Sequence, residues 1–95
     1  MRFEWSPLKE LLNIEKHKVS FREAIEVFKD PDAFDLEDKE HSEVEARQFM
    51  TGKILDGRII TVRFTVRDDV IRIFGAGEWR YFRSLYYEKT KHKKS

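Results

Sequence analysis

Apolar positions in the N-terminal part of the chain recur with helical spacing, after a short extended segment at residues 3–5. Ser6 followed by Pro7 predicts a helix start, with serine as the N-cap and proline at the first helical position. We expect this helix over residues 7–16. Its apolar stripe would consist of Leu8, Leu11 and Leu12, and a different face would carry Lys9, Asn13 and Lys16.

A second helix is predicted from Ser20, which forms a capping box with Glu23. Its buried face follows the spacing i, i+3, i+4 and i+7 at Phe21, Ala24, Ile25 and Phe28. We expect this helix to end at Asp30-Pro31, because the residue before a proline avoids the helical region.

The pattern then changes to alternation. Residues 32–45 are expected to form an acidic loop with a short strand at 33–36, followed by strands at 47–55, 58–67 and 70–76. Asp56-Gly57 and Asp68-Asp69 are the expected turns between them. The clearest alternation predicts a core face at Ile60, Val62, Phe64 and Val66, to which the last strand would add Ile71 and Ile73. Arg72 and Phe74 would lie on the opposite face.

A last helix is predicted over residues 78–89, with Trp79, Phe82 and Tyr86 as its stripe and a frayed basic tail at 89–95. Helices and strands are thus segregated along the chain, which indicates a single α+β domain with two layers. We expect two N-terminal helices and a C-terminal helix packed on an antiparallel meander sheet.

Composition limits the class of protein. Hydrophobic residues make up 40% and aromatic residues 14%, enough for a folded core. The chain has no cysteine, which favours a reducing compartment, and no run of apolar residues approaches the ~20 of a membrane span. We therefore expect a cytoplasmic protein. We find no cofactor-binding or metal-ligand motif, because Gly75-Ala76-Gly77 is too short for a dinucleotide fingerprint and His41 near Asp38 and Glu45 lacks ligand spacing.

The net charge is only +1, but the two signs are segregated. Residues 1–45 hold 7 Lys and Arg against 13 Asp and Glu, whereas residues 46–95 hold 12 against 5. Either the basic half meets a polyanion or an acidic partner, or the two halves neutralise each other within the fold.

The N-terminal pattern resembles the BrnT family of toxins in Phe3-Glu4-Trp5, Lys9, Asn13, Lys16-His17, Val19-Ser20-Phe21, Glu23-Ala24, Val27-Phe28 and Asp30-Pro31. Later residues resemble it in His41-Ser42, Glu45, Arg47, Gly52, Asp56-Gly57-Arg58, Val62, Thr65, Arg72-Ile73, Gly75-Ala76-Gly77, Trp79-Arg80 and Tyr87-Glu88. The resemblance spans roughly residues 3–88.

This resemblance implies a RelE-like fold and an endoribonuclease toxin that cuts RNA and arrests translation. It also implies a BrnA-like antitoxin with a ribbon–helix–helix domain, through which the complex would reach operator DNA. Many members carry Ser-Ala-Arg where this chain has Gly75-Ala76-Gly77, followed by Glu78. The alternative is therefore a non-catalytic member that binds only the antitoxin or nucleic acid.

RNA cleavage without a metal needs a base for the 2′-OH, a cation for the charged phosphorane and an acid for the leaving oxygen. The candidate catalytic residues are Arg63, Arg72, Arg80 and His17, because arginine binds phosphate bidentately and histidine exchanges protons near neutral pH. We expect Arg63 and Arg72 to be cross-strand neighbours. The candidate RNA-binding residues are Lys9, Lys16, Arg83 and Trp79. For each histidine, lysine and aromatic residue a structural role is the competing interpretation.

Overall fold

The computed structural model describes residues 2–41 and 45–91. Its elements are β1 (Arg2–Trp5), α1 (Pro7–His17), α2 (Phe21–Ala24), the 3₁₀ helix η1 (Ile25–Lys29), β2 (Phe34–Glu37), the 3₁₀ helix η2 (Lys39–His41), β3 (Arg47–Lys53), β4 (Ile59–Arg67), β5 (Val70–Gly77) and α3 (Arg80–Thr90). Residues 42–44 of the predicted acidic loop and 92–95 of the predicted tail lie outside the described residues.

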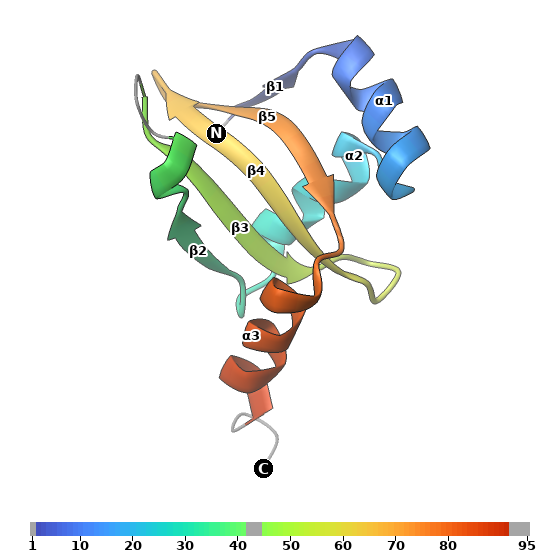
Figure 1. Ribbon diagram of the computed structural model, residues 1–95, viewed down its shortest axis with the longest axis vertical. Coiled ribbons are helices and arrows are strands. Elements are labelled where there is room, and N and C mark those ends of the chain that lie inside the picture. Colours follow the sequence, from blue (N-terminus) through green and yellow to red (C-terminus); the bar gives the residue numbers. More distant parts are fainter. Residues whose placement is uncertain (1, 42–44, 92–95) are drawn as a thin grey trace.

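The five strands form one sheet in the order β1-β5-β4-β3-β2 (Figure 1). Strands β2 to β5 pair antiparallel, but β1 lies parallel to β5. The expectation of a purely antiparallel sheet is therefore wrong. Since α1, α2 and η1 separate β1 from the other strands, no hairpin turn joins β1 to its neighbour and fixes its direction.

The predicted turns and caps are confirmed. Gly57 has φ +95°, and the β4–β5 hairpin turns through Asp68 and Asp69, both with positive φ. Two such residues match the right-handed twist of the paired strands. The Ser6 side chain accepts a hydrogen bond from the backbone N–H of Lys9, and both bonds of the Ser20 capping box are present.

The hydrophobic core lies between the sheet and α2–η1, which Figure 1 shows behind the strands. It contains the predicted Phe21, Ala24, Ile60, Val62, Phe64, Ile71 and Ile73, together with Val19, Val27, Ile54 and Ala76. Val66 is 47% exposed near the end of β4 and does not join it.

The predicted apolar stripe of α1 is wrong. Leu8, Leu11 and Leu12 are 65%, 65% and 57% exposed, whereas the buried residue of α1 is the polar Asn13. Asn13 donates hydrogen bonds to the carbonyls of Val19 and Ala76 and accepts one from Ala76 N–H. The helix therefore joins β5 through hydrogen bonds to backbone groups and turns its leucines outward.

Helix α3 packs on the other face of the sheet, against β3 and β4, and projects from one end (Figure 1). The rings of Phe82 and Phe49 lie 4.8 Å apart. The buried Tyr86 hydroxyl donates to Asp30, whose carboxylate also accepts from Lys53 N–H. Although burial raises the pKa of Asp30, these hydrogen bonds bring it below its ordinary value.

The chain ends differ slightly from prediction. Helix α3 continues through Thr90, so the tail begins later than residue 89. In the described part of the chain, no helix has the length and apolar composition needed to cross a membrane.

Candidate functional site

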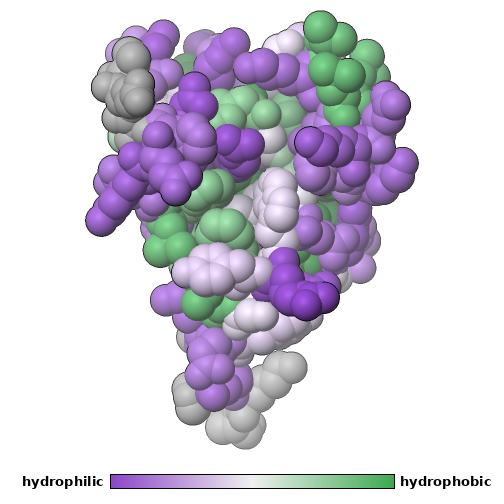
Figure 2. Space-filling model, in the orientation of Figure 1, coloured by the Kyte–Doolittle hydropathy of each residue, from purple (hydrophilic) through white to green (hydrophobic). Residues whose placement is uncertain are grey.

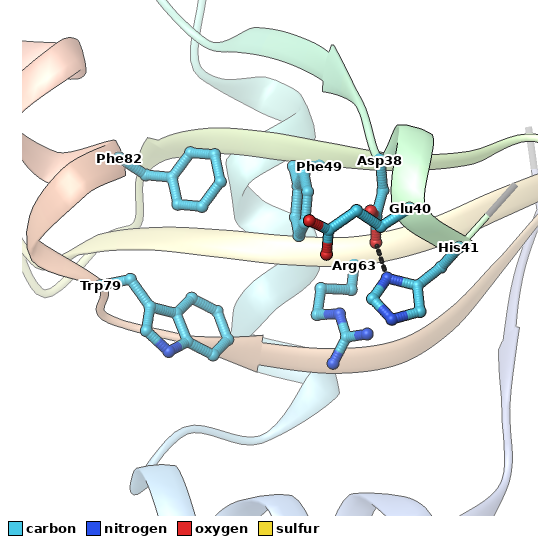
Figure 3. A pocket seen from close by; sticks show the side chains of 7 residues that line it. All are labelled: Asp38, Glu40, His41, Phe49, Arg63, Trp79 and Phe82. Atoms are coloured by element: carbon cyan, nitrogen blue, oxygen red, sulfur yellow. Dashed lines mark hydrogen bonds and ion pairs between the residues drawn. The ribbon is translucent and has the colours of Figure 1, made fainter.

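Two adjoining hollows lie on the sheet face opposite the core, and both are lined by Arg63 and Trp79. The first, here called the aromatic hollow, has a volume of about 460 Å³ and is also lined by Asp38, Glu40, His41, Phe49 and Phe82 (Figure 3). The second, the α1 hollow, has about 270 Å³ and is also lined by Lys9, Leu12, Asn13, Lys16, His17, Phe74 and Gly75. Together they form one candidate site.

Arg63 stands in the middle of this site. Its guanidinium lies over the ring of Phe74, 5.7 Å from the centroid, and the Arg47 guanidinium lies 4.7 Å from the same centroid. Gly75 on β5 lies opposite Arg63 on β4, and a Cβ at position 75 would lie 3.3 Å from Arg63 Cδ. Within residues 2–41 and 45–91, Arg63 makes no ion pair with a carboxylate. A half-buried guanidinium without a carboxylate partner among the described residues is suited to bind a phosphate.

His17 reaches the site from the last turn of α1. Its ring packs edge-on against Trp79, with centroids 5.2 Å apart. Burial, and then the positive charge of Lys16, lower the pKa of His17 below its ordinary value of 6.5. The ring is therefore neutral at pH 7 and able to accept a proton.

Gly77 makes this packing possible. A Cβ at this position would lie 3.0 Å from the Trp79 ring and 3.2 Å from His17 Nδ1. Gly75 and Gly77 thus serve close packing, and the two rings take up the space that a side chain at position 77 would need.

His41 lines the opposite end of the site. Its Nδ1 is 2.9 Å from Asp38 Oδ2, and because the carboxylate only accepts, Nδ1 is the donor (Figure 3). Asp38 is buried and fixes the ring, which leaves Nε2 for a substrate. Sequence reasoning considered His41 only as a metal ligand. The three-residue separation of Asp38 and His41 was the available indication of this pair.

The predicted site residues separate into two groups. The structure brings together Lys9, Lys16, His17, Arg63 and Trp79, all of which line the site. Arg72 instead pairs with Glu4 at 2.9 Å, and its cross-strand partner is Thr65. The expectation that Arg63 and Arg72 are cross-strand neighbours is wrong. The Asp68-Asp69 turn pairs Arg67 with Val70, and this register sets Arg72 opposite Thr65, whereas Arg63 lies opposite Gly75.

Arg80 and Arg83 are exposed on α3 and do not line either hollow. The sequence did not indicate His41, Glu40 and Phe49 as site residues. They lie on η2 and β3, and only the folding of the sheet brings these segments beside Arg63 and Trp79. In the part of the chain that the structure describes, no three His, Asp or Glu side chains form a metal-binding group.

The charge segregation has a mixed explanation. Three arginines of the basic half pair with acids of the first half: Arg58 with Glu23, Arg67 with Glu45 and Arg72 with Glu4. The two halves thus partly neutralise each other, while Lys9, Lys16 and Arg63 form a cationic centre at the site.

Comparisons with known proteins concern the family and the fold. A family model described as the ribonuclease toxin BrnT of type II toxin–antitoxin systems matches residues 5–81. The fold is similar to the crystal structure of the Brucella abortus ribonuclease toxin BrnT, with a TM-score of 0.63 and 20% identity, over 83% of this chain and 96% of that one. A comparison with curated proteins gives no significant match. Because the family model spans most of its length, this chain belongs to the BrnT family of ribonuclease toxins of type II toxin–antitoxin systems.

Proposed function

We propose that the chain is an endoribonuclease that cuts RNA at the combined hollow, without a metal ion, and thereby arrests translation in the cytoplasm. The observation that carries this proposal is the position of Arg63, an unpaired cation among the described residues, in the wall shared by the two hollows. His17 lines one hollow and His41 the other.

The three groups match the chemistry of cleavage by a 2′-OH. Neutral His17 takes the proton of the 2′-OH while the 2′-oxygen forms its bond to phosphorus. Arg63 stabilises the charged phosphorane. The bond from phosphorus to the 5′-oxygen then breaks, and His41 Nε2 gives that oxygen a proton. The products are a 2′,3′-cyclic phosphate and a 5′-OH. Lys9 and Lys16 hold neighbouring phosphates, and Trp79 offers a surface for base stacking.

The test is cleavage of a purified mRNA by the purified chain in EDTA, with mapping of the fragment ends. We expect cyclic phosphate ends, and a loss of about 100-fold or more in rate for Arg63→Ala, as for removal of an oxyanion-hole donor. Arg67→Ala is the matched control, since Arg67 lies on the same strand, paired with Glu45. Intact RNA with the wild-type chain would favour the non-catalytic alternative, and undiminished cleavage by Arg63→Ala would remove this site.

We further propose a BrnA-like ribbon–helix–helix antitoxin as the partner, which would carry the complex to operator DNA. The α1 leucine ridge (Leu8, Leu11 and Leu12) supports a protein partner, because three large apolar side chains on one helix are more than half exposed. Figure 2 shows hydrophobic atoms gathered over α1. Leu12 and the cations Lys9 and Lys16 border the site, so an antitoxin segment with apolar and acidic residues could cover both.

The RelE-like assignment of the fold is also a proposal. Superposition of the sheet and α3 on a RelE-like ribonuclease, with matching strand order, tests it.

A further inference from the structure

We propose that the aromatic hollow is a nucleobase subsite that selects guanine, with Glu40 as the residue that reads the base. This inference deepens the proposed function, since it names the base next to the phosphate that Arg63 would hold.

The walls of the hollow suit a flat, unpaired base. Trp79, Phe49 and Phe82 come from the β5–α3 connection, β3 and α3, and their rings surround the same space (Figure 3). Phe49 and Phe82 are only partly buried, although their ring centroids are 4.8 Å apart. Single-stranded RNA is commonly held by stacking bases on such aromatic side chains.

Glu40 supplies the polar recognition. Its side chain extends from η2 toward Phe49 and the interior of the hollow (Figure 3). It makes no hydrogen bond or ion pair with another residue that the structure describes. The second carboxylate of the hollow, Asp38, is buried and already bound to His41. Glu40 is therefore the acceptor available to a ligand.

An ionised carboxylate offers two adjacent acceptors and no donor. Guanine is the base whose Watson–Crick edge carries two adjacent donors, N1–H and the N2 amino group, so both bonds can form at once. Adenine and cytosine each place a ring-nitrogen acceptor beside their amino group, and uracil places one N–H between two carbonyls. Each of these three bases would direct a lone pair at the carboxylate, which disfavours them.

The position of Arg63 connects base and phosphate. It lines the same hollow as Glu40 and separates the aromatic hollow from His17 in the α1 hollow. A guanosine stacked on the aromatic wall would thus have an adjacent phosphate within the cationic centre, beside the groups proposed for proton transfer.

Calorimetric binding of the 3′- and 5′-monophosphates of the four nucleosides to the purified chain tests the proposal. We expect guanosine monophosphates to bind about 10- to 100-fold more tightly than the others, the discrimination of one good bidentate pair. Glu40→Gln should reduce this preference to about 3-fold or less, because an amide offers one acceptor and one donor. Glu37→Gln, which removes a nearby exposed carboxylate on β2, should keep the preference.

A second variant separates stacking from base reading. Phe82→Leu should weaken all four nucleotides by about 10-fold or more and leave the guanine preference, since every base has a π-face. Circular dichroism confirms that each variant is folded. Equal binding of the four nucleotides by the wild-type chain, or an unchanged guanine preference in Glu40→Gln, would overturn the subsite.

Failure of the subsite and failure of the nuclease are distinguishable. A chain that cuts RNA after or before any base and binds the nucleotides equally keeps the nuclease and loses the subsite. A chain that selects guanosine monophosphates but leaves RNA intact keeps the subsite and loses the nuclease.

Discussion

At the scale of single residues, the site depends on two glycines, because a side chain at either position would occupy the space of a site residue. Gly75 leaves room for the aliphatic part of Arg63, and Gly77 lets the His17 and Trp79 rings meet. The packing of His17 has an electrostatic result, since burial and Lys16 both disfavour its charged form. A histidine at the end of a helix would otherwise be favoured as a cation by the helix dipole.

This environment predicts a pH dependence of cleavage. As a general base, His17 must be neutral, so the rate should rise as the pH passes the His17 pKa, which lies below 6.5. His17→Gln should lower the rate by about 100-fold and remove this rising limb. The measurement is the initial rate of RNA cleavage between about pH 4.5 and about pH 8, a range that brackets the ordinary histidine pKa of about 6.5.

Lys16→Gln tests whether the charge of Lys16 lowers the pKa of His17. Removing a positive charge beside His17 stabilises the imidazolium, raises the His17 pKa and should move the limb to higher pH. Lys29→Gln removes an exposed lysine of η1 and should leave the limb in place. A limb that survives in His17→Gln would assign the base to another group.

At the scale of elements, α1 has two separate tasks. Asn13 fastens the helix to Ala76 of β5 by two hydrogen bonds and bonds the Val19 carbonyl by a third, which holds Lys9, Lys16 and His17 over the sheet. The leucine ridge faces away from the core and is available to a partner. Three largely exposed leucines on one helix form an apolar surface that is typical of a protein interaction site.

Removing part of the ridge should weaken antitoxin binding without harming the free enzyme. We expect the double variant Leu8→Ser, Leu11→Ser to bind the co-encoded antitoxin about 100-fold less tightly, which corresponds to loss of about 3 kcal/mol of apolar burial. Cleavage by the free toxin should be unchanged, because neither residue lines the hollows. The measurement is calorimetric titration of toxin with antitoxin.

Leu55→Ser is the matched control for this experiment. Leu55 is 89% exposed in the β3–β4 turn and lies outside the ridge, so its loss should leave the affinity unchanged. If the ridge variant binds as tightly as the wild-type chain, the antitoxin uses another surface.

At the scale of the whole molecule, part of the basic charge is held in ion pairs. Arg58, Arg67 and Arg72 pair with acids, whereas Lys9, Lys16 and Arg63 line the α1 hollow, where we expect RNA to bind. The chain should therefore bind RNA through few phosphates, in contrast to a protein that uses its entire basic half.

The salt dependence of RNA affinity measures this number. Three phosphate contacts predict a slope of log affinity against log salt of about −2 for single strands, and Lys9→Gln should reduce it by about 0.7. Lys29→Gln should leave the slope unchanged. A steep slope of about −8 would mean that the basic half binds RNA as a whole. The measurement is fluorescence anisotropy of a labelled 2′-O-methyl RNA with the wild-type chain and each lysine variant, because this RNA lacks the 2′-OH that cleavage needs.

Much of the local structure could be predicted from the sequence. Serine caps, the Asp30-Pro31 stop, the Asp56-Gly57 turn and the alternation of β4 act between near neighbours. Each had the expected outcome except at Val66, which is exposed near the end of β4. The resemblance in the N-terminal residues likewise indicated the family whose model matches residues 5–81. These features depend on short-range physics or on patterns that a linear sequence retains.

Only the tertiary structure decided which residues far apart in the sequence become partners. The helical spacing of leucines in α1 does not reveal which face meets the sheet, and the buried Asn13 finds its backbone partner 63 residues away. The parallel placement of β1 sets Glu4 beside Arg72, and the register of β4 and β5 sets Arg63 opposite Gly75. Since pairing and burial are set by the global packing of the chain, the composition of the site follows from the fold, whereas the elements themselves follow from the sequence.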